Sequence, residues 1–428
     1  MILIYSNIST ARLQYICKFI FAEQLGITYT ITIDEDGFNQ HDGPKINYSN
    51  KVTEGNSFTL VNHPLLFETG IRLQETTCFD TSGSKAFFKS TGGDFSFDLF
   101  AAAFYLLTRY EEYLPHGKDS YGRFAHENAL AYKEGFLNSP VINKWILSFA
   151  DALKNKFPVL SFKFPVFEFI PTYDIDIAYS YKGKGMMRNI GGFIKKPSLE
   201  RIRVLAGLQK DPFNSYAFLD ALHEKLNMNP VYFFLVAIKN SIYDKNISPY
   251  TNAMWQLMKK HAEKYSIGLH PSWKSNENIT ILNKEKKILE AATKTEILLS
   301  RQHYIKFNLP QTFDNLLEAG IKADFSMGYG SINGFRASIA TPFFWYSLKD
   351  EQVTPLKLYP FCYMDANSHY EQKYTAEQAF EELAHYHATC KQVNGCLVTI
   401  FHNNFLGTDP SFAGWQELYD RFISQVQQ

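Results

Sequence analysis

The chain has 428 residues, of which 45% are hydrophobic and 16% aromatic, enough to bury one large core and a smaller one. Lysine plus arginine and aspartate plus glutamate each number 43, and the resulting charge of zero gives no global field toward nucleic acid or an anionic membrane. We expect a cytoplasmic protein without a membrane span, because the five cysteines form no regular framework, the opening MILIYSNIST turns polar too early for a signal peptide, and the apolar run 99–108 is too short for a bilayer.

Residues 1–160 are predicted to form a small α/β domain. Apolar runs at 2–5 and 28–33 indicate strands, and the amphipathic stretch 11–25, which ends at Gly26, indicates a helix between them. Long apolar periodicity at 97–114 predicts a buried helix. The module carries no nucleotide-binding fingerprint, so its role is unknown.

Residues 161–428 change to short apolar strands separated by longer helical stretches. The predicted strands are 166–173, 231–236, 267–269, 304–307, 321–325, 356–361 and 396–401. The predicted helices are 215–226, 249–265, 284–299, 311–319 and 376–393. Alternation of this kind favours parallel βα units, and so many units favour a closed barrel over an open sheet. We therefore expect a distorted (β/α)7 barrel behind the small α/β domain.

The first strand of this barrel ends in two carboxylates, Asp174 and Asp176. Side chains alternate across a strand, so both acids are expected on one side, close enough to share a metal or to divide acid and base roles. The alternative is a strand that merely runs into an Asx-type turn.

Other ionisable residues follow the later strands. His270 ends the third strand, Arg301 and His303 lie beside the fourth, Asp324 lies at the end of the fifth, and His402 follows the last. A barrel places these positions at one edge, where carboxylates and imidazoles can bind a borderline divalent metal. A single buried histidine is more often structural, but ionisable groups at four strand ends favour a site.

This set, in this order, resembles the NodB-like polysaccharide deacetylases of carbohydrate esterase family four, over roughly residues 165 to 410. Thr172-Tyr173-Asp174-Ile175-Asp176 is similar to the family's Thr-Phe-Asp-Asp-Gly motif, and Ile400-Phe401-His402 resembles its closing Leu-x-His motif. Arg301 ahead of the helix that ends in Ala319-Gly320 is similar to the third motif.

The resemblance implies a role for each matched residue. Asp174 would be the general base, Asp176 a metal ligand, Arg301 the tether of the base and His402 the general acid. Asp324 is the best match to the family's fourth motif. The implied reaction removes acetyl groups from N-acetylated or O-acetylated sugars or polysaccharide, with a divalent metal, zinc before cobalt or nickel.

One motif departs from the family pattern. Of His-Ser/Thr-x-x-His only His270 is present, because Pro271 and Lys274 stand at the other fixed places. An ammonium group cannot bind a cation, so we expect His303 to complete a site with Asp176 and His270. The alternative is that His303 packs between the barrel and the helix starting near residue 311.

Sugar contacts are expected from Trp273 and Tyr329, since sugars commonly lie on aromatic rings, although core packing is an alternative for such rings. Arg336 and Asp324 are further expected substrate contacts, and Arg336 is also the alternative to Arg301. A second function left open is a non-catalytic glycan-binding barrel descended from a deacetylase. Glycoside hydrolysis fits poorly, because acids two residues apart on one strand cannot flank a glycosidic bond.

Overall fold

The computed structural model describes residues 1–428 apart from 52–55, 82, 196 and 427–428. The chain forms two compact units, and each combines separate stretches of sequence. The first unit contains Met1–Glu168, Gly334–Pro360 and Thr389–Cys396, and the second contains Phe169–Asn333, Phe361–Ala388 and Leu397–Gln428. The division of the chain into domains 1–160 and 161–428 stays a prediction.

The first unit contains a parallel four-stranded sheet with the order β2-β1-β3-β4. Its strands are β1 (Ile2–Tyr5), β2 (Tyr29–Thr32), β3 (Lys45–Asn47) and β4 (Phe58–Thr59). Its helices are α1 (Ala11–Cys17), α2 (Glu35–Asn39), α3 (Leu99–Leu107), α4 (Leu130–Lys133) and α5 (Val141–Lys156). The strands expected at 2–5 and 28–33 are confirmed, and the helix expected at 11–25 is α1 continued by a π-helix over Lys18–Gln24.

Helix α3 forms the buried centre of this unit. Every residue from Leu99 to Leu107 is buried, which confirms the buried helix expected in this region. Asp98 caps the helix by accepting a hydrogen bond from the N–H of Ala101, and its other oxygen accepts one from the hydroxyl of Tyr48 at 2.6 Å.

Two antiparallel pairs complete the first unit, β5 (Phe79–Thr81) with β6 (Ser84–Ala86), and β12 (Phe343–Ser347) with β13 (Gln352–Leu358). The turn after β12 is joined to α1 by an ion pair between Arg12 and Glu351, with 2.5 Å between Nη2 and Oε1. Arg12 also donates to the carbonyl oxygens of Leu65 and Gly70, so one buried guanidinium connects three stretches of this unit.

The second unit is built on a sheet whose strands follow the order β11-β10-β9-β8-β7-β15-β14. They are β7 (Glu168–Ile175), β8 (Val231–Leu235), β9 (Ser266–His270), β10 (Leu299–Ser300), β11 (Ala323–Asp324), β14 (Tyr363–Met364) and β15 (Cys396–His402). The pairs from β7 to β11 are parallel, as is β14 with β15. The carboxyl ends of these parallel strands meet at one edge of the sheet, which is where the expected site residues lie.

The expected strands at 231–236, 267–269, 321–325 and 396–401 are confirmed as β8, β9, β11 and β15, and the expected strand 166–173 is β7, shifted by two residues. The strand expected at 304–307 is wrong. His303–Ile305 form a turn of 3₁₀-helix, because Tyr304 and Ile305 have φ values of 58° and 53°, outside the region of a strand. The run expected at 356–361 overlaps β13, which is antiparallel and belongs to the first unit.

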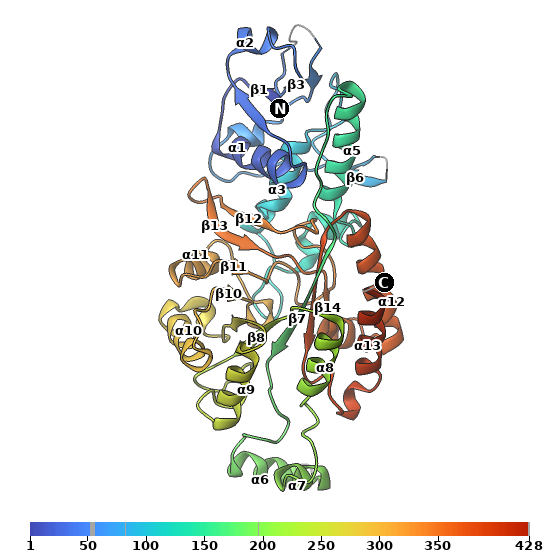
Figure 1. Cartoon of the computed structure of the whole chain (residues 1–428). Helices are drawn as coiled ribbons and strands as arrows, with labels where there is room; N and C mark the ends of the chain where they lie inside the picture. Colours follow the sequence, from blue (N-terminus) through green and yellow to red (C-terminus); the bar gives the residue numbers. More distant parts are fainter. Residues whose placement is uncertain (52–55, 82, 196, 427–428) are drawn as a thin grey trace. The chain divides into compact units, whose positions relative to one another are not determined.

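The helices of the second unit are α6 (Met186–Lys195), α7 (Leu199–Leu205), α8 (Tyr216–Leu226), α9 (Asn252–Ala262), α10 (Ile279–Thr293), α11 (Gln311–Glu318), α12 (Ala376–Gln392) and α13 (Trp415–Val426). Helices α9 and α10 lie on one side of β7 and β8, and α12 and α13 lie on the other (Figure 1). Thr251 caps helix α9, because its hydroxyl accepts a hydrogen bond from the N–H of Met254, and the helix buries Leu257 and Met258. Across the described residues, no helix has both the length and the apolar character needed to cross a bilayer.

A buried charge cluster lies in the first unit, where Glu112 accepts hydrogen bonds from two arginines. Its Oε1 lies 2.7 Å from Nε of Arg109 and 2.8 Å from Nε of Arg336, and its Oε2 lies 2.7 Å from Nη2 of Arg336. Burial alone would raise the pKa of Glu112, but Arg336 and Arg109 outweigh it and lower the pKa to about 2.

We predict that Glu112→Gln lowers the free energy of unfolding by about 3–5 kcal/mol at neutral pH, because it removes the buried negative charge that Arg109 and Arg336 share, although Arg109 keeps its ion pair with Glu111. A carboxylate whose pKa is lowered on folding stabilises the protein above its unfolded pKa, and this contribution is lost as pH falls through the folded pKa. The difference between parent and variant should therefore shrink between about pH 4.5 and pH 2, the pKa values of the group in the unfolded and folded protein.

Urea unfolding followed by fluorescence at several pH values measures this difference. Glu127→Gln is the matched control, since the Glu127 side chain is 61% exposed beside His126. An equal, pH-independent effect of both substitutions would contradict the stabilising role of Glu112.

Candidate metal and catalytic site

Strand β7 delivers two carboxylates to the sheet edge. Its last residues, Thr172 to Ile175, are buried and pair in parallel with Val231 to Phe234 of β8. Asp174 lies within the strand with only 2% of its side chain exposed, whereas Asp176 lies just beyond the strand with 23% exposed. The inner acid is therefore held in the barrel wall, and the outer acid faces the opening of the site.

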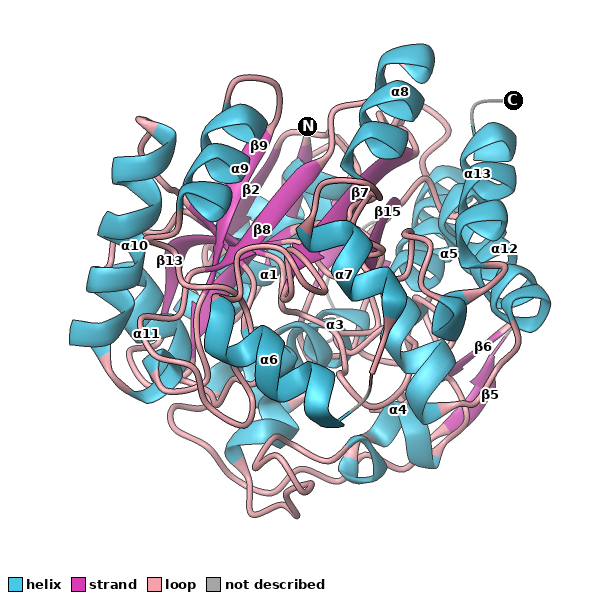
Figure 2. Cartoon of the chain, turned by 90° about the horizontal axis from the view of Figure 1, so that it is seen from below, coloured by secondary structure: helices cyan, strands magenta, loops and turns pink. Residues whose placement is uncertain are grey.

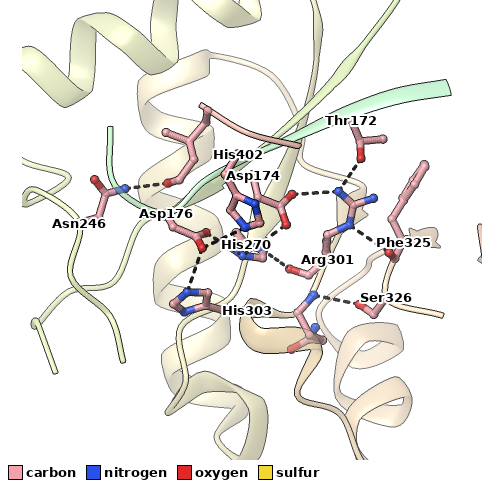
Figure 3. A network of polar contacts seen from close by, with 12 residues as sticks. Thr172, Asp174, Asp176, Asn246, His270, Arg301, His303, Phe325, Ser326 and His402 are labelled. Carbon is pink, nitrogen blue, oxygen red and sulfur yellow. Dashed lines mark hydrogen bonds and ion pairs between the residues drawn. The ribbon is translucent and has the colours of Figure 1, made fainter. Parts of the chain in front are cut away.

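Three imidazoles surround the carboxylate of Asp176 (Figure 3). Nε2 of His270 lies 3.0 Å from Oδ1, and Nε2 of His303 and of His402 each lie 3.4 Å from Oδ2. These histidines come from the end of β9, from the turn after β10 and from the end of β15. Their Nε2 atoms converge because all these parallel strands end at the same edge.

The second nitrogen of each imidazole has its own acceptor. Nδ1 of His270 donates to the carbonyl oxygen of Arg301 at 2.5 Å, and Nδ1 of His303 donates to Oδ1 of Asp244 at 3.1 Å. Nδ1 of His402 donates to Oδ1 of Asp365 at 2.7 Å. An acceptor at Nδ1 fixes the proton there, which leaves the Nε2 lone pair of a neutral ring directed at Asp176.

Asp365 holds His402 at two points. Besides the imidazole contact, its Oδ2 accepts a hydrogen bond from the backbone N–H of His402 at 2.7 Å. Asp365 is fully buried and follows β14, which is parallel to β15, so the two strands present acid and imidazole side by side. Ring and backbone of His402 are thus fixed by one carboxylate.

Arg301 ties the inner acid to the sheet. Its Nη1 donates to Oδ1 of Asp174 at 2.9 Å and to Oγ1 of Thr172 at 2.6 Å, and its Nε donates to the carbonyl oxygen of Phe325 at 3.0 Å. The guanidinium is completely buried and lies over the ring of Phe233, 4.4 Å from its centroid. Asp174 is therefore held in one orientation, with its Oδ2 on the side of His270, 3.8 Å from Nε2.

The donors of Asp176, His270 and His303 suit a divalent metal. One donor atom from each lies within 4.8 Å of the others. For bonds of about 2.0–2.1 Å in a tetrahedron, neighbouring donors are roughly 3.3 Å apart, close to the 3.0 Å and 3.4 Å found between Asp176 and the two imidazoles. The buried Oδ1 of Asp176 also has no hydrogen-bond donor among the described residues, as expected for an atom that binds a cation.

Burial and the neighbouring charges have opposite effects on the pKa values of Asp176 and His303. Burial alone would raise the pKa of Asp176, but the imidazoles of His303 and His270 outweigh it and hold that pKa well below its ordinary value. Burial would lower the pKa of His303, but Asp176 and Asp244 raise it to about 9. A bound cation would take the place of the protons that these imidazoles otherwise share with Asp176.

Asp324 lies beneath the site and is fully buried. Its Oδ2 accepts hydrogen bonds from the hydroxyls of Ser300 and Ser326, and Oγ of Ser326 in turn accepts one from the N–H of Gln302. Burial raises the pKa of Asp324 to about 6 despite these donors. Asp324 is an expected substrate contact, but its hydrogen bonds support the segment that carries Arg301 and His303. Its side chain is not exposed.

The other expected sugar contacts lie in different surroundings. Trp273 is partly exposed, stacks on Tyr243 with 3.7 Å between ring centroids, and donates its backbone N–H to Asp244. Tyr329 and Arg336 are each 1% exposed, and Arg336 belongs to the first unit, where it pairs with Glu112. In this structure only Trp273 of the four offers surface to a ligand, because the other three are enclosed by their own partners.

Sequence reasoning missed Asp244 and Asp365. Asp365 directly follows the apolar pair Tyr363-Met364 of β14, so the strand-end rule that identified the other residues would have found it had this short strand been recognised. Asp244 lies nine residues beyond β8, in a loop, and no strand-end signal identifies it. Lys274, at the place of the missing second histidine, is exposed.

Comparison with known proteins gives a family match for the first part of the chain. Residues 2–158 match a family model described as a family of unknown function, DUF7033. No curated protein matches the chain.

Solved structures similar to this chain include carbohydrate-modifying enzymes. A protein from Mycobacterium smegmatis named as a polysaccharide deacetylase has 14% identity and a TM-score of 0.41, with 61% of this chain and 84% of that chain covered. The polysaccharide deacetylase Bc1974 from Bacillus cereus has 10% identity and a TM-score of 0.31, with coverage of 60% and 87%. A family four pseudoenzyme from Bacillus anthracis has 8% identity and a TM-score of 0.32, with coverage of 61% and 60%. At these scores the likeness assigns neither a family nor a reaction to the chain.

We predict that Asp176→Asn, His270→Ala and His303→Ala each weaken zinc binding by at least about tenfold, because a catalytic zinc site needs three protein ligands. Isothermal titration of the metal-stripped protein measures the affinity, and thermal unfolding of each variant without metal checks that it folds. His385→Ala is the matched control, since His385 is exposed on α12. Parent-like affinity of His303→Ala would remove His303 from the ligand set.

Proposed function

We propose that the chain is a metal-dependent hydrolase that removes acetyl groups from N-acetylated or O-acetylated sugars or polysaccharide. The observation that carries the proposal is the arrangement around Asp176, where His270 and His303 complete a three-donor group while His402 and the Arg301-bound Asp174 stand beside it. The motif resemblance to NodB-like deacetylases supports the same assignment. Zinc is the first choice of cation, because imidazole and carboxylate donors suit it.

Asp176, His270 and His303 would hold the cation. When bound, it supplies Lewis acidity toward the acyl carbonyl and toward water. The acceptors at Nδ1 of both histidines, the Arg301 carbonyl and Asp244, keep their rings in the orientation that this role requires.

Asp174 acts as the general base in the proposed reaction. The hydrogen bond from Arg301 fixes the carboxyl group of Asp174, and its Oδ2 remains on the side of His270. A carboxylate so placed accepts the proton of the attacking water. Arg301 is a positioning residue, because it acts through Asp174.

His402 acts as the general acid. Burial would lower its pKa, but Asp365 and Asp176 outweigh it and raise the pKa well above the ordinary value, so the imidazolium persists at neutral pH. Its Nε2 lies 3.4 Å from Oδ2 of Asp176, and from this position it can pass a proton to the leaving amine or alkoxide. The departing group then leaves neutral.

The same geometry disfavours glycoside hydrolysis. Oδ2 of Asp174 and Oδ1 of Asp176 both approach the single nitrogen Nε2 of His270, at 3.8 Å and 3.0 Å. The two acids therefore lie on one side of any ligand, whereas glycosidase carboxylates flank the scissile bond.

Acetate release from a panel of N- and O-acetylated sugars and oligosaccharides tests the function. We expect release that stops with a chelator and returns with zinc, cobalt or nickel, and a loss of about two or more orders of magnitude in kcat for Asp174→Asn with zinc affinity kept. Glycan binding without turnover by the metal-loaded parent would instead support the non-catalytic barrel. Unchanged acetate release by Asp174→Asn would refute the base assignment.

A second prediction concerns pH. Activity that needs protonated His402 falls as pH rises through the raised pKa of that group, so Asp365→Asn, which removes the neighbouring negative charge, should move the alkaline limb to lower pH. The limb should vanish in His402→Gln, together with most of kcat. Profiles of kcat against pH for the three proteins provide the test, with Asp409→Asn as a surface control. An identical limb in parent and both variants would exclude His402 as the acid.

A further inference from the structure

A basic, apolar helical hairpin lies between β7 and α8, and it is formed by α6 and α7. In the view from below, the two helices lie nearest to the viewer, in front of the sheet of the second unit (Figure 2). The proposed reaction uses none of their residues.

The large apolar side chains of α6 are exposed to an unusual degree. Met186, Met187 and Ile194 have 77%, 88% and 75% of their surface exposed, and Ile190 and Phe193 have 53% and 37%. At 100° per residue, these five positions occupy one face of the helix. Exposed apolar residues scattered singly are ordinary, but a continuous apolar face marks an interaction site.

Helix α7 continues the apolar surface. Leu199, Ile202 and Leu205 recur every three residues and are 73%, 49% and 50% exposed, and Leu208 beyond the helix is 81% exposed. A groove of about 670 Å³ is lined by residues of both helices, including Met186, Ile190, Phe193, Ile202 and Leu205. The two helices therefore share one apolar surface.

Contacts within the unit hold the hairpin in place. Nη1 of Arg201 in α7 donates to the carbonyl oxygen of Asn189 in α6 at 2.9 Å, and Arg188 donates to the carbonyl oxygen of Lys245. Beyond the hairpin, the carboxylate of Asp211 accepts hydrogen bonds from the N–H groups of Ser180, Tyr181 and Lys182, which joins the two ends of the segment. The apolar face is thus presented by an anchored element.

The segment is also strongly basic, although the whole chain is neutral. Residues 182–210 contain one acid, Glu200, and eight basic residues, Lys182, Lys184, Arg188, Lys195, Lys196, Arg201, Arg203 and Lys210. Arg188 and Lys195 lie on the face of α6 opposite Met186 and Ile190, as the same helical rotation requires. An apolar face bordered by cations matches the boundary between acyl chains and anionic headgroups.

We propose that α6 and α7 dock the protein on the surface of a bilayer containing anionic lipids, with the apolar face in the headgroup boundary and the basic residues on the phosphates. The positive charge of the segment favours an anionic bilayer over the other possible partners of this surface. A soluble protein partner would need an acidic rim around an apolar ridge, and a second copy of this chain would place the same cations against one another. The inference does not depend on the proposed reaction.

Sedimentation of the full-length protein with vesicles tests the proposal. We expect binding to vesicles of phosphatidylcholine mixed with phosphatidylglycerol, weaker binding to pure phosphatidylcholine, and a decrease at high salt. Met187→Glu/Ile194→Glu should reduce binding by roughly tenfold or more, since both side chains are exposed and their replacement leaves the core intact. Lys195→Glu/Arg203→Glu should reduce binding to the anionic vesicles alone.

Matched controls are Leu73→Glu/Val159→Glu for the apolar change, at sites 86% and 80% exposed, and Lys225→Glu/Lys322→Glu for the charge change. Both controls should bind like the parent. The proposal is overturned if the parent ignores anionic vesicles, or if Met187→Glu/Ile194→Glu binds as the parent does. It is also overturned if the parent self-associates in lipid-free solution and Met187→Glu/Ile194→Glu abolishes this self-association without changing vesicle binding. The apolar surface would then bind a second copy of the chain.

Discussion

The carboxylate of Asp176 is the constraint on which the site depends, because three imidazoles converge on its two oxygens at 3.0 to 3.4 Å. A carboxylate among three neutral rings and without a cation would be poorly compensated in a partly buried position. Protons on the rings, or a metal ion, must supply the positive charge. The same arrangement therefore explains why the pKa of His303 rises and why the donors suit a divalent cation.

The hydrogen-bond acceptors at Nδ1 of the three imidazoles fix the orientation of the rings around Asp176. Arg301 has two functions through different atoms, since its carbonyl oxygen orients His270 while its guanidinium holds Asp174. Asp244 and Asp365 orient the other two rings. A substitution at Arg301 removes the guanidinium from Asp174 but keeps the backbone carbonyl that orients His270, and a substitution at Asp365 acts on His402 and leaves the three-donor group in place. Metal affinity and the pH profile of activity can therefore distinguish the roles of the three metal-binding residues from the role of His402.

Much of the second unit could be predicted, because parallel strands buried on both faces have continuous apolar sequences and end abruptly in polar residues. That pattern located β8, β9 and β15, and with them His270 and His402. It failed for β10 and β14, which are two residues long, since so short a run carries no periodicity. The 3₁₀ turn at His303 was invisible for another reason: Tyr304 and Ile305 adopt positive φ, which nothing in their side chains favours. His303 was nevertheless proposed as a ligand, from the need for a third donor.

The net charge of zero does not reveal that charge is unevenly distributed along the chain. Residues 182–210 hold eight of the 43 lysines and arginines but one of the 43 aspartates and glutamates, so the remainder of the chain is acidic. An acidic remainder is repelled by an anionic surface while the hairpin is attracted, and the two effects together orient the protein as well as bind it. The hairpin follows β7 by ten residues, so the strand that carries Asp174 and ends just before Asp176 leads into the proposed docking element.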